Sequence, residues 1–315
     1  MNGYDVTRRR FLQVSSAAVA AGAVPAASAS ESDWSTAETP TASTLYGAEY
    51  TADGAYAVGA GGVALHRTGE GWRTAFDGGV TGNGNSLYGA DVTDDGERLW
   101  VVGASGAVGE YDVETGDLRS HSAPTGSTNN FNDVAVTGPA GEANVYVAGD
   151  SGKIYYSFEN GEDQTWEYVT PGSGSAISAV DFHDVRAGHA VDTNGRAFQT
   201  ADGTTWNGVG IGDANVTFYG VDSDALDDVR VSGGGGKVFH YDGAQWTSTD
   251  LGDAGLRDVE SENGDGFTVG GGGKLFDQTN GTWTQDRTPT GQNLTAVVRG
   301  STDVAVGAGG IVIER

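Results

Sequence analysis

A short glycine-rich pattern occurs seven times in this chain of 315 residues and constrains its fold more than any other feature. Copies such as VGAGG and VGASG recur about every 40 residues. Every copy ends on the same glycine: Gly62, Gly106, Gly152, Gly195, Gly236, Gly273 and Gly310. Short strands and tight turns at this period are typical of β-propellers, in which each repeat forms one four-stranded blade. The sequence therefore predicts an all-β, seven-bladed propeller.

Each copy of the pattern lies inside a longer repeat of strand-like segments. In the sixth copy, residues 256–259, 266–270 and 274–276 read as three strands, and a fourth begins at Trp283 after the Asn280-Gly281 turn. A large aromatic residue recurring once per repeat predicts packing between blades. It is present in five repeats as Trp72, Trp166, Trp206, Trp246 and Trp283. We expect blades to start near residues 45, 87, 131, 177, 218, 256 and 294 within one domain, residues 30–315.

The seventh repeat is too short to form a whole blade. Only five residues follow Gly310, which is enough for a third strand and no fourth. A segment around Trp34 resembles the tryptophan-led fourth strand of the other repeats. We therefore expect residues 30–44 to complete the last blade, which would remove two open sheet edges and close the ring.

The N-terminus resembles a twin-arginine export signal. Paired arginines precede an apolar pair, in the order Arg8, Arg9, Phe11 and Leu12. A mild apolar stretch over residues 14–24 follows, which is too short for a stable membrane anchor, and small residues then allow cleavage after Ala29. Residues 1–29 are therefore predicted to direct export through the twin-arginine translocase, to the cell surface or beyond. The chain has no cysteine, which excludes a lipid anchor of the cysteine-linked kind.

The chain is strongly acidic, with 43 Asp and Glu against 17 Lys and Arg and a formal net charge of −26. This charge argues against a nucleic-acid partner, because little in the chain could neutralise phosphates. Three interpretations remain. The low lysine content with abundant aspartate resembles halophilic archaeal proteins, whose acidic surfaces suit high salt. The acids could also form cation sites, or the domain could be an ordinary acidic one.

Five acids occupy one position of the repeat, directly after the opening pair of apolar or small residues. They are Glu49, Asp91, Asp181, Asp222 and Glu260. If the opening segment is the innermost strand, these carboxylates come from equivalent points around the central channel. Clustered oxygen ligands suit calcium or another hard cation, which makes this ring the candidate metal site. The alternative is that the acids are simply solvated at the channel mouth.

Other signs of chemistry are sparse. His183 and His189 could meet across a hairpin, but further metal ligands cannot be assigned to them. The chain has no cysteine nucleophile and no recognisable serine elbow. Residues 269–274, VGGGGK, look like a phosphate loop but recur as a turn between strands in the other repeats. No residue is therefore assigned a catalytic role.

Degenerate Asp-box motifs carry a family resemblance. Residues 200–206, TADGTTW, nearly match the pattern Ser/Thr-x-Asp-x-Gly-x-Thr-Trp, while residues 157–166 and 241–246 match it more loosely. The repeat resembles the WD40/YVTN/BNR-like propellers, which include photosystem II assembly factors and sialidase-type Asp-box proteins. The resemblance implies that Asp202 holds a turn and is not a catalyst. The arginine cluster that sialidases require is absent from the sequence.

Fold resemblance does not carry function. The preferred interpretation is a secreted, non-catalytic, monomeric scaffold that binds a protein or glycan ligand through its loops. One alternative is an extracellular hydrolase or lyase acting on glycans, which would need two carboxylates at catalytic separation in the channel. Another is an assembly factor for an exported or membrane complex.

Overall fold

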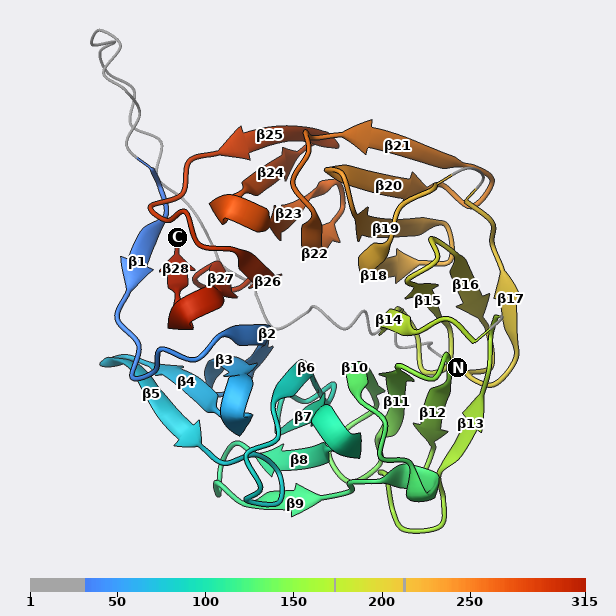
Figure 1. The fold of residues 1–315 in the computed structure, drawn as a ribbon. Coiled ribbons are helices and arrows are strands. Elements are labelled where there is room, and N and C mark those ends of the chain that lie inside the picture. Colours follow the sequence, from blue (N-terminus) through green and yellow to red (C-terminus); the bar gives the residue numbers. More distant parts are fainter. Residues whose placement is uncertain (1–31, 173, 212–213) are drawn as a thin grey trace, which may run out of the picture.

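Seven four-stranded antiparallel sheets form a ring in the computed structural model, which describes residues 32–172, 174–211 and 214–315 (Figure 1). Each sheet is one blade, with its first strand at the central channel and its last strand at the rim. The predicted seven-bladed, all-β propeller is confirmed. The predicted signal segment, with Arg8, Arg9, Phe11, Leu12 and Ala29, lies outside the described residues.

The first four blades follow the chain in order. Blade 1 comprises β2 (Leu45–Thr51), β3 (Gly54–Gly59), β4 (Ala64–Thr68) and β5 (Gly71–Phe76). Blade 2 comprises β6 (Leu87–Val92), β7 (Arg98–Gly103), β8 (Val108–Asp112) and β9 (Leu118–Ser120). Blade 3 comprises β10 (Phe131–Thr137), β11 (Asn144–Gly149), β12 (Ile154–Ser157) and β13 (Glu167–Val169). Blade 4 comprises β14 (Ile177–Phe182), β15 (Gly188–Asp192), β16 (Ala197–Thr200) and β17 (Trp206–Gly208).

The last three blades end on both termini of the described chain. Blade 5 comprises β18 (Phe218–Ala225), β19 (Asp228–Gly233), β20 (Lys237–Tyr241) and β21 (Trp246–Asp250). Blade 6 comprises β22 (Leu256–Glu262), β23 (Asp265–Gly270), β24 (Leu275–Thr279) and β25 (Thr282–Asp286). Blade 7 comprises β26 (Leu294–Val298), β27 (Val304–Gly307), β28 (Val312–Glu314) and β1 (Ser35–Ala37). Short 3-10 turns are η1 (Ala60–Gly62), η2 (Ala104–Gly106), η3 (Pro124–Gly126), η4 (Gly271–Gly273) and η5 (Ala308–Gly310).

The core lies between neighbouring blades, because the second strand of each blade is covered on both faces. In β11, all six residues are buried. β-branched and aromatic residues suit such strands, since they fill the space between two pleated surfaces. One side of β11 packs with Trp100 of blade 2, while Tyr146 stacks on Phe182 of blade 4 at a ring-centroid distance of 3.7 Å. Side chains of the repeats thus hold one blade to the next.

The N-terminal strand closes the ring, as the sequence predicts. β1 pairs antiparallel with β28, with Ser35 opposite Glu314 and Ala37 opposite Val312. Trp34, which is 2% exposed, packs edge-to-face on Phe267 of blade 6 at a centroid distance of 5.5 Å. Its indole N–H donates to Asp286 at 3.1 Å. The first and last residues of the propeller are therefore tied both to each other and to blade 6.

Glu314 extends this closure to blade 1. Its carboxylate accepts hydrogen bonds from the Arg67 guanidinium at 2.8 and 3.2 Å and from the Trp72 indole at 2.7 Å. Because Trp72 is buried and belongs to the outer strand of blade 1, this contact joins the first blade to the last. The Trp246 indole makes a similar bond from blade 5 to the Val209 carbonyl beside blade 4, at 2.6 Å. These bonds bear out the predicted packing between blades for Trp72 and Trp246.

The glycine turns connect the second and third strands of the blades. The last glycine of all seven copies has a φ between 65° and 78°, a region that favours glycine over other residues. At Gly310, a Cβ would also collide with the Thr41 carbonyl of the following connection. Both constraints explain why this glycine never varies. They also explain the turn at residues 271–273, which lies between two strands and is not a phosphate loop.

Candidate functional site

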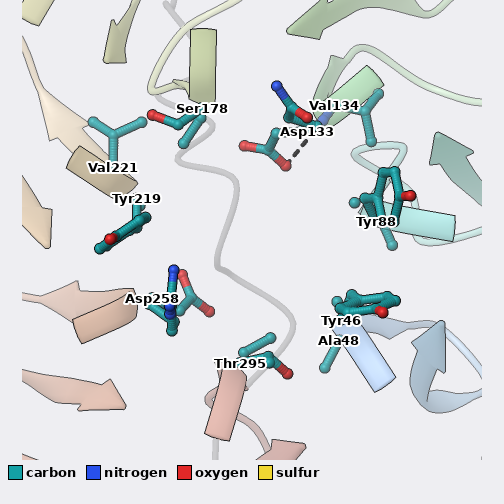
Figure 2. Close-up of a pocket in the computed structure, with 18 of the residues that line it drawn as sticks. Tyr46, Ala48, Tyr88, Asp133, Val134, Ser178, Tyr219, Val221, Asp258 and Thr295 are labelled. Carbon is teal, nitrogen blue, oxygen red and sulfur yellow. Dashed lines mark hydrogen bonds between the residues drawn. The ribbon is translucent and has the colours of Figure 1, made fainter. Parts of the chain in front are cut away.

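A cavity with a volume of about 740 Å³ occupies the central channel, on the face that carries the glycine turns. The inner strands start at this face, because the first residue of each pairs with the end of the second strand, just before the turn. Leu45 opposite Gly59 and Leu87 opposite Gly103 show this register. The inner strands therefore present successive rings of side chains from the mouth of the cavity downward (Figure 2).

The outermost ring, here called the mouth collar, consists of the second residue of each inner strand. Its members are Tyr46, Tyr88, Asn132, Ser178, Tyr219, Arg257 and Thr295. The rings of Tyr46 and Tyr88 pack edge-to-face with their centroids 5.4 Å apart. The Arg257 guanidinium lies 4.2 Å from the centre of the Tyr219 ring. Partial burial raises the pKa of Tyr88 above its usual value. The collar combines aromatic rings and neutral hydrogen-bonding groups (Figure 2) with one cation, Arg257.

The five acids predicted from the sequence do line this cavity. Each comes from the inner strand of a different blade, β2, β6, β14, β18 and β22. They are Glu49, Asp91, Asp181, Asp222 and Glu260. Two more carboxylates, Asp133 and Asp258, lie nearer the mouth, at the third residue of β10 and β22 rather than the fifth. With Asp150, the described lining holds eight acidic residues and a single basic one, Arg257. The cavity is thus a strongly acidic site.

Three of the predicted acids hold neighbouring blades together. The Val136 N–H donates to Asp91 at 2.6 Å, the Ser223 N–H to Asp181 at 2.7 Å, and the Ser261 N–H to Asp222 at 2.6 Å. In each case the donor lies on the inner strand of the next blade. The inner strands of different blades are not paired in a sheet, so these carboxylates satisfy backbone donors that would otherwise be left without a partner.

Asp133 and Asp258 make the same kind of bond one step nearer the mouth. Asp133 accepts the Val180 N–H at 3.0 Å, and Asp258 accepts the Val297 N–H at 2.9 Å. Each also accepts the N–H of the residue that follows it. Desolvation raises the pKa of Asp133 well above its usual value, although both N–H groups oppose this rise. This pair of acids could not be predicted from the repeat, because both lie two residues before the position of the other five.

A sequence signal for the displaced pair exists in the preceding blades. Gly89 and Gly220 occupy the equivalent strand position one blade earlier. A Cβ on Gly89 would approach the Asp133 Cα to 2.8 Å, and a Cβ on Gly220 would approach the Asp258 Cα to 3.1 Å. A glycine followed by an aspartate at the same position of the next repeat therefore marks a carboxylate that bridges two blades.

The metal prediction stays a prediction. Among the described residues, no group of three or more His, Asp or Glu side chains is gathered closely enough to hold an ion. The carboxylates of Asp91, Asp181 and Asp222 are oriented by backbone N–H groups rather than toward a common centre.

His183 and His189 come together as the sequence suggested, through a shared hydroxyl. The Ser223 Oγ lies 2.9 Å from His183 Nδ1 and 2.7 Å from His189 Nδ1. Because a hydroxyl carries one proton, it donates to one imidazole and accepts from the other. Burial, followed by the charge of His183, lowers the pKa of His189 to about 4. The pair is therefore a buried polar contact between blades 4 and 5.

The Asp-box of blade 4 holds a turn. The Asp202 carboxylate accepts the N–H groups of Thr204 at 2.8 Å and Thr205 at 2.6 Å, and the Thr200 hydroxyl accepts the Gly203 N–H at 2.9 Å. These hydrogen bonds keep the pKa of Asp202 well below its usual value. Asp242 makes the same pair of backbone contacts in blade 5. Both acids lie at the ends of the third strands, far along the blade from the channel.

Comparison with known proteins found no matching family model and no matching curated protein. Several solved structures do resemble this chain. YCF48 bound to D1 peptide is 15% identical with a TM-score of 0.71, covering 89% of this chain and 94% of that one. Virginiamycin B lyase from Staphylococcus aureus is 12% identical with a TM-score of 0.75, covering 90% and 98%. The WD40 propeller domain of Doa1 is 10% identical with a TM-score of 0.73, covering 90% and 97%.

These likenesses, together with the seven four-stranded sheets, show the fold, a seven-bladed β-propeller. At such low identity they show the fold alone, because propellers of one shape serve both binding and catalysis. In the part of the chain that the structure describes, none of the helices has the length and apolar character needed to cross a membrane.

Proposed function

We propose that this protein is a non-catalytic scaffold that binds a partner protein at the mouth of the central channel, by taking up a cationic side chain of the partner. The observation that carries the proposal is the position of two collar tyrosines, Tyr46 and Tyr88, above an acidic cavity. The ring of the third, Tyr219, is already in contact with Arg257. Carboxylates at the walls of a cleft focus a negative potential into it. Aromatic faces at the entrance also attract cations.

YCF48 bound to D1 peptide, which has the same fold, supports a peptide as one kind of ligand for a propeller of this shape. An assembly factor for an exported complex is one form that such a scaffold could take. A glycan-active hydrolase or lyase fits less well. Asp91, Asp181 and Asp222 each accept a backbone N–H of the next blade, so these carboxylates are engaged in holding the blades together.

The ligand class can be tested with three fluorescent pentapeptides that differ only at the central residue, Gly-Gly-X-Gly-Gly with X as Lys, Gln or Glu. Both ends should be blocked, and each peptide is titrated at the same ionic strength. We expect the lysine peptide to bind at least tenfold more tightly than the glutamate peptide, and to weaken as salt is raised. Equal affinities for the three peptides, or preference for glutamate, would contradict a cation-binding mouth.

We further propose that the scaffold acts outside the cytoplasm, at the cell surface or beyond. The support is the Arg8-Arg9 pair, with Phe11 and Leu12 and a cleavage site at Ala29. Replacing both arginines by lysine keeps the charge but removes the pair that the twin-arginine translocase reads. We expect that variant to stay in the cytoplasm at its full length, while the native chain is found outside and shortened. Export of both to the same extent would refute this route.

A further inference from the structure

A second hollow, here called the lateral groove, lies between the outer strands of blades 4 and 5, away from the channel. Its volume is about 530 Å³. Blade 4 contributes β16, β17 and the connection that follows, and blade 5 contributes β20 and β21. Gln199, Asn207, Tyr241, Gln245, Trp246 and Ser248 supply its polar and aromatic side chains.

The described lining of the lateral groove contains no Asp, Glu, Lys, Arg or His. This is unusual for a chain with a net charge of −26. The corresponding hollow between blades 1 and 2, with a volume of about 610 Å³, is lined by Asp53, His66, Arg67 and Arg73 among others. The two hollows occupy equivalent positions in the propeller, so the neutrality of the lateral groove is a local property. A neutral lining selects against charged ligands, because it offers no partner for a desolvated charge.

Two aromatic side chains form a rigid platform in the groove. The rings of Tyr241 and Trp246 are stacked at a centroid distance of 4.9 Å and an interplanar angle of 28°. The Trp246 indole N–H donates to the Val209 carbonyl at 2.6 Å, and the Tyr241 hydroxyl donates to the Gly243 carbonyl at 2.9 Å. Both donors are therefore used within the protein, and the platform offers a ligand its apolar faces only.

The remaining polar side chains of the groove are amides. Within the described part of the chain, the amides of Gln199, Asn207 and Gln245 make no hydrogen bond to another residue. Asn207 and Gln245 are exposed. Each amide carries two donor hydrogens and an accepting oxygen. The groove thus presents apolar ring faces beside groups that both donate and accept.

We propose that the lateral groove binds a neutral carbohydrate, a short stretch of hexopyranose units. A pyranose ring has an apolar C–H face that can pack on an aromatic platform, and a rim of uncharged hydroxyls that both donate and accept hydrogen bonds, as the amides do. A proline-rich peptide fits less well. Its carbonyls need aromatic N–H and O–H donors, and those of Trp246 and Tyr241 are already used. This site is independent of the channel mouth.

The proposal is tested by calorimetric titration of the full chain with maltohexaose, cellohexaose and mannohexaose. A nona-proline peptide and hexagalacturonate serve as comparison ligands. A shallow, open groove implies weak binding, with a dissociation constant of about 1 mM for the preferred sugar. We expect saturable binding of at least one neutral hexasaccharide, and none of hexagalacturonate.

Asn207 allows the groove to be blocked from its blade 4 wall. It pairs with Gln199 across β16 and β17, so both side chains lie on the face that points to blade 5, and it is exposed. Asn207→Trp should therefore fill the groove and weaken sugar binding at least tenfold. Arg73→Trp is the matched control, because Arg73 follows Trp72 as Asn207 follows Trp206, is also exposed, and lines the charged hollow between blades 1 and 2. It should change the affinity less than twofold.

Asn207→Ala provides a second variant should Asn207→Trp lower the melting temperature, because it removes the amide at an exposed position without adding bulk. It should weaken sugar binding several-fold in a fully folded protein. The proposal is overturned if none of the three hexasaccharides binds, if only the proline peptide binds, or if Asn207→Trp and Arg73→Trp affect sugar binding equally. Sugar binding has no bearing on the pentapeptide titration, so the two proposals can fail separately.

Discussion

Replacing Trp34 by alanine tests how strongly the N-terminal strand closes the propeller. The side chain is 2% exposed and packs on Phe267, and the Arg315 guanidinium lies 5.3 Å from its ring. A tryptophan buries up to about 250 Å², and at roughly 25 cal/mol per Å² this corresponds to about 6 kcal/mol for the whole side chain. Alanine keeps part of that area, so the loss should lie near 4 kcal/mol, within the usual range for large-to-small core substitutions.

Urea denaturation at a fixed, high salt concentration measures this loss directly. In a domain of this size, about 4 kcal/mol corresponds to a fall in melting temperature of roughly 8–16 °C. Trp34→Phe is the control: it keeps an aromatic ring on Phe267 but removes the hydrogen bond to Asp286. That variant should lose only about 1–2 kcal/mol. A loss below about 1 kcal/mol for Trp34→Ala would mean that the strand lies on the ring without stabilising it.

Three further outcomes follow from the structure. Gly310→Ala should lower the free energy of unfolding by several kcal/mol, because it adds a clash with the Thr41 carbonyl to the backbone strain. Gly309→Ala, where φ is 70° and the space is open, should lower it by about 1 kcal/mol. Equal losses for the two variants would show that the clash does not contribute. Folding lowers the pKa of His189 to about 4, so the unfolded state binds more protons between pH 6.5 and 4. The free energy of unfolding should therefore fall by up to about 3 kcal/mol as the pH drops through that window. Urea titrations of His189→Leu should show a smaller fall, and a fall equal to that of the native protein would mean that another group causes it. Dialysis to low salt should unfold the chain, since its 43 acids then repel without screening; native circular dichroism in dilute buffer would argue against adaptation to high salt.

The fold was predictable because its signals repeat. The seventh glycine, Gly310, has a positive φ and a crowded surrounding like the other six, so one rule of local geometry recurs at every blade. The closing strand could be found because Trp34 resembles the tryptophans of other outer strands. These features depend on short-range geometry, which the order of residues expresses directly.

The candidate site was only partly predictable. The repeat placed Asp91, Asp181 and Asp222 correctly in the channel, but their bonds to the next blade depend on how far apart two inner strands lie. The mouth collar was missed because its seven members share a position and not a residue type. Aligning the second residues of the seven inner strands would have found Tyr46 and Tyr88. The lateral groove arises from a gap between blades, and no periodic signal marks it.

The central claim is that the mouth collar binds the partner, and the affinity of a collar variant tests it most directly. The lysine pentapeptide should be titrated against the Tyr46→Ala/Tyr88→Ala double variant and against Tyr168→Ala, which removes an exposed tyrosine from the rim of blade 3. Loss of two aromatic faces from a cation site predicts at least a tenfold weaker dissociation constant for the double variant, and less than a twofold change for Tyr168→Ala. Equal affinities in the native protein and in the double variant would contradict the account.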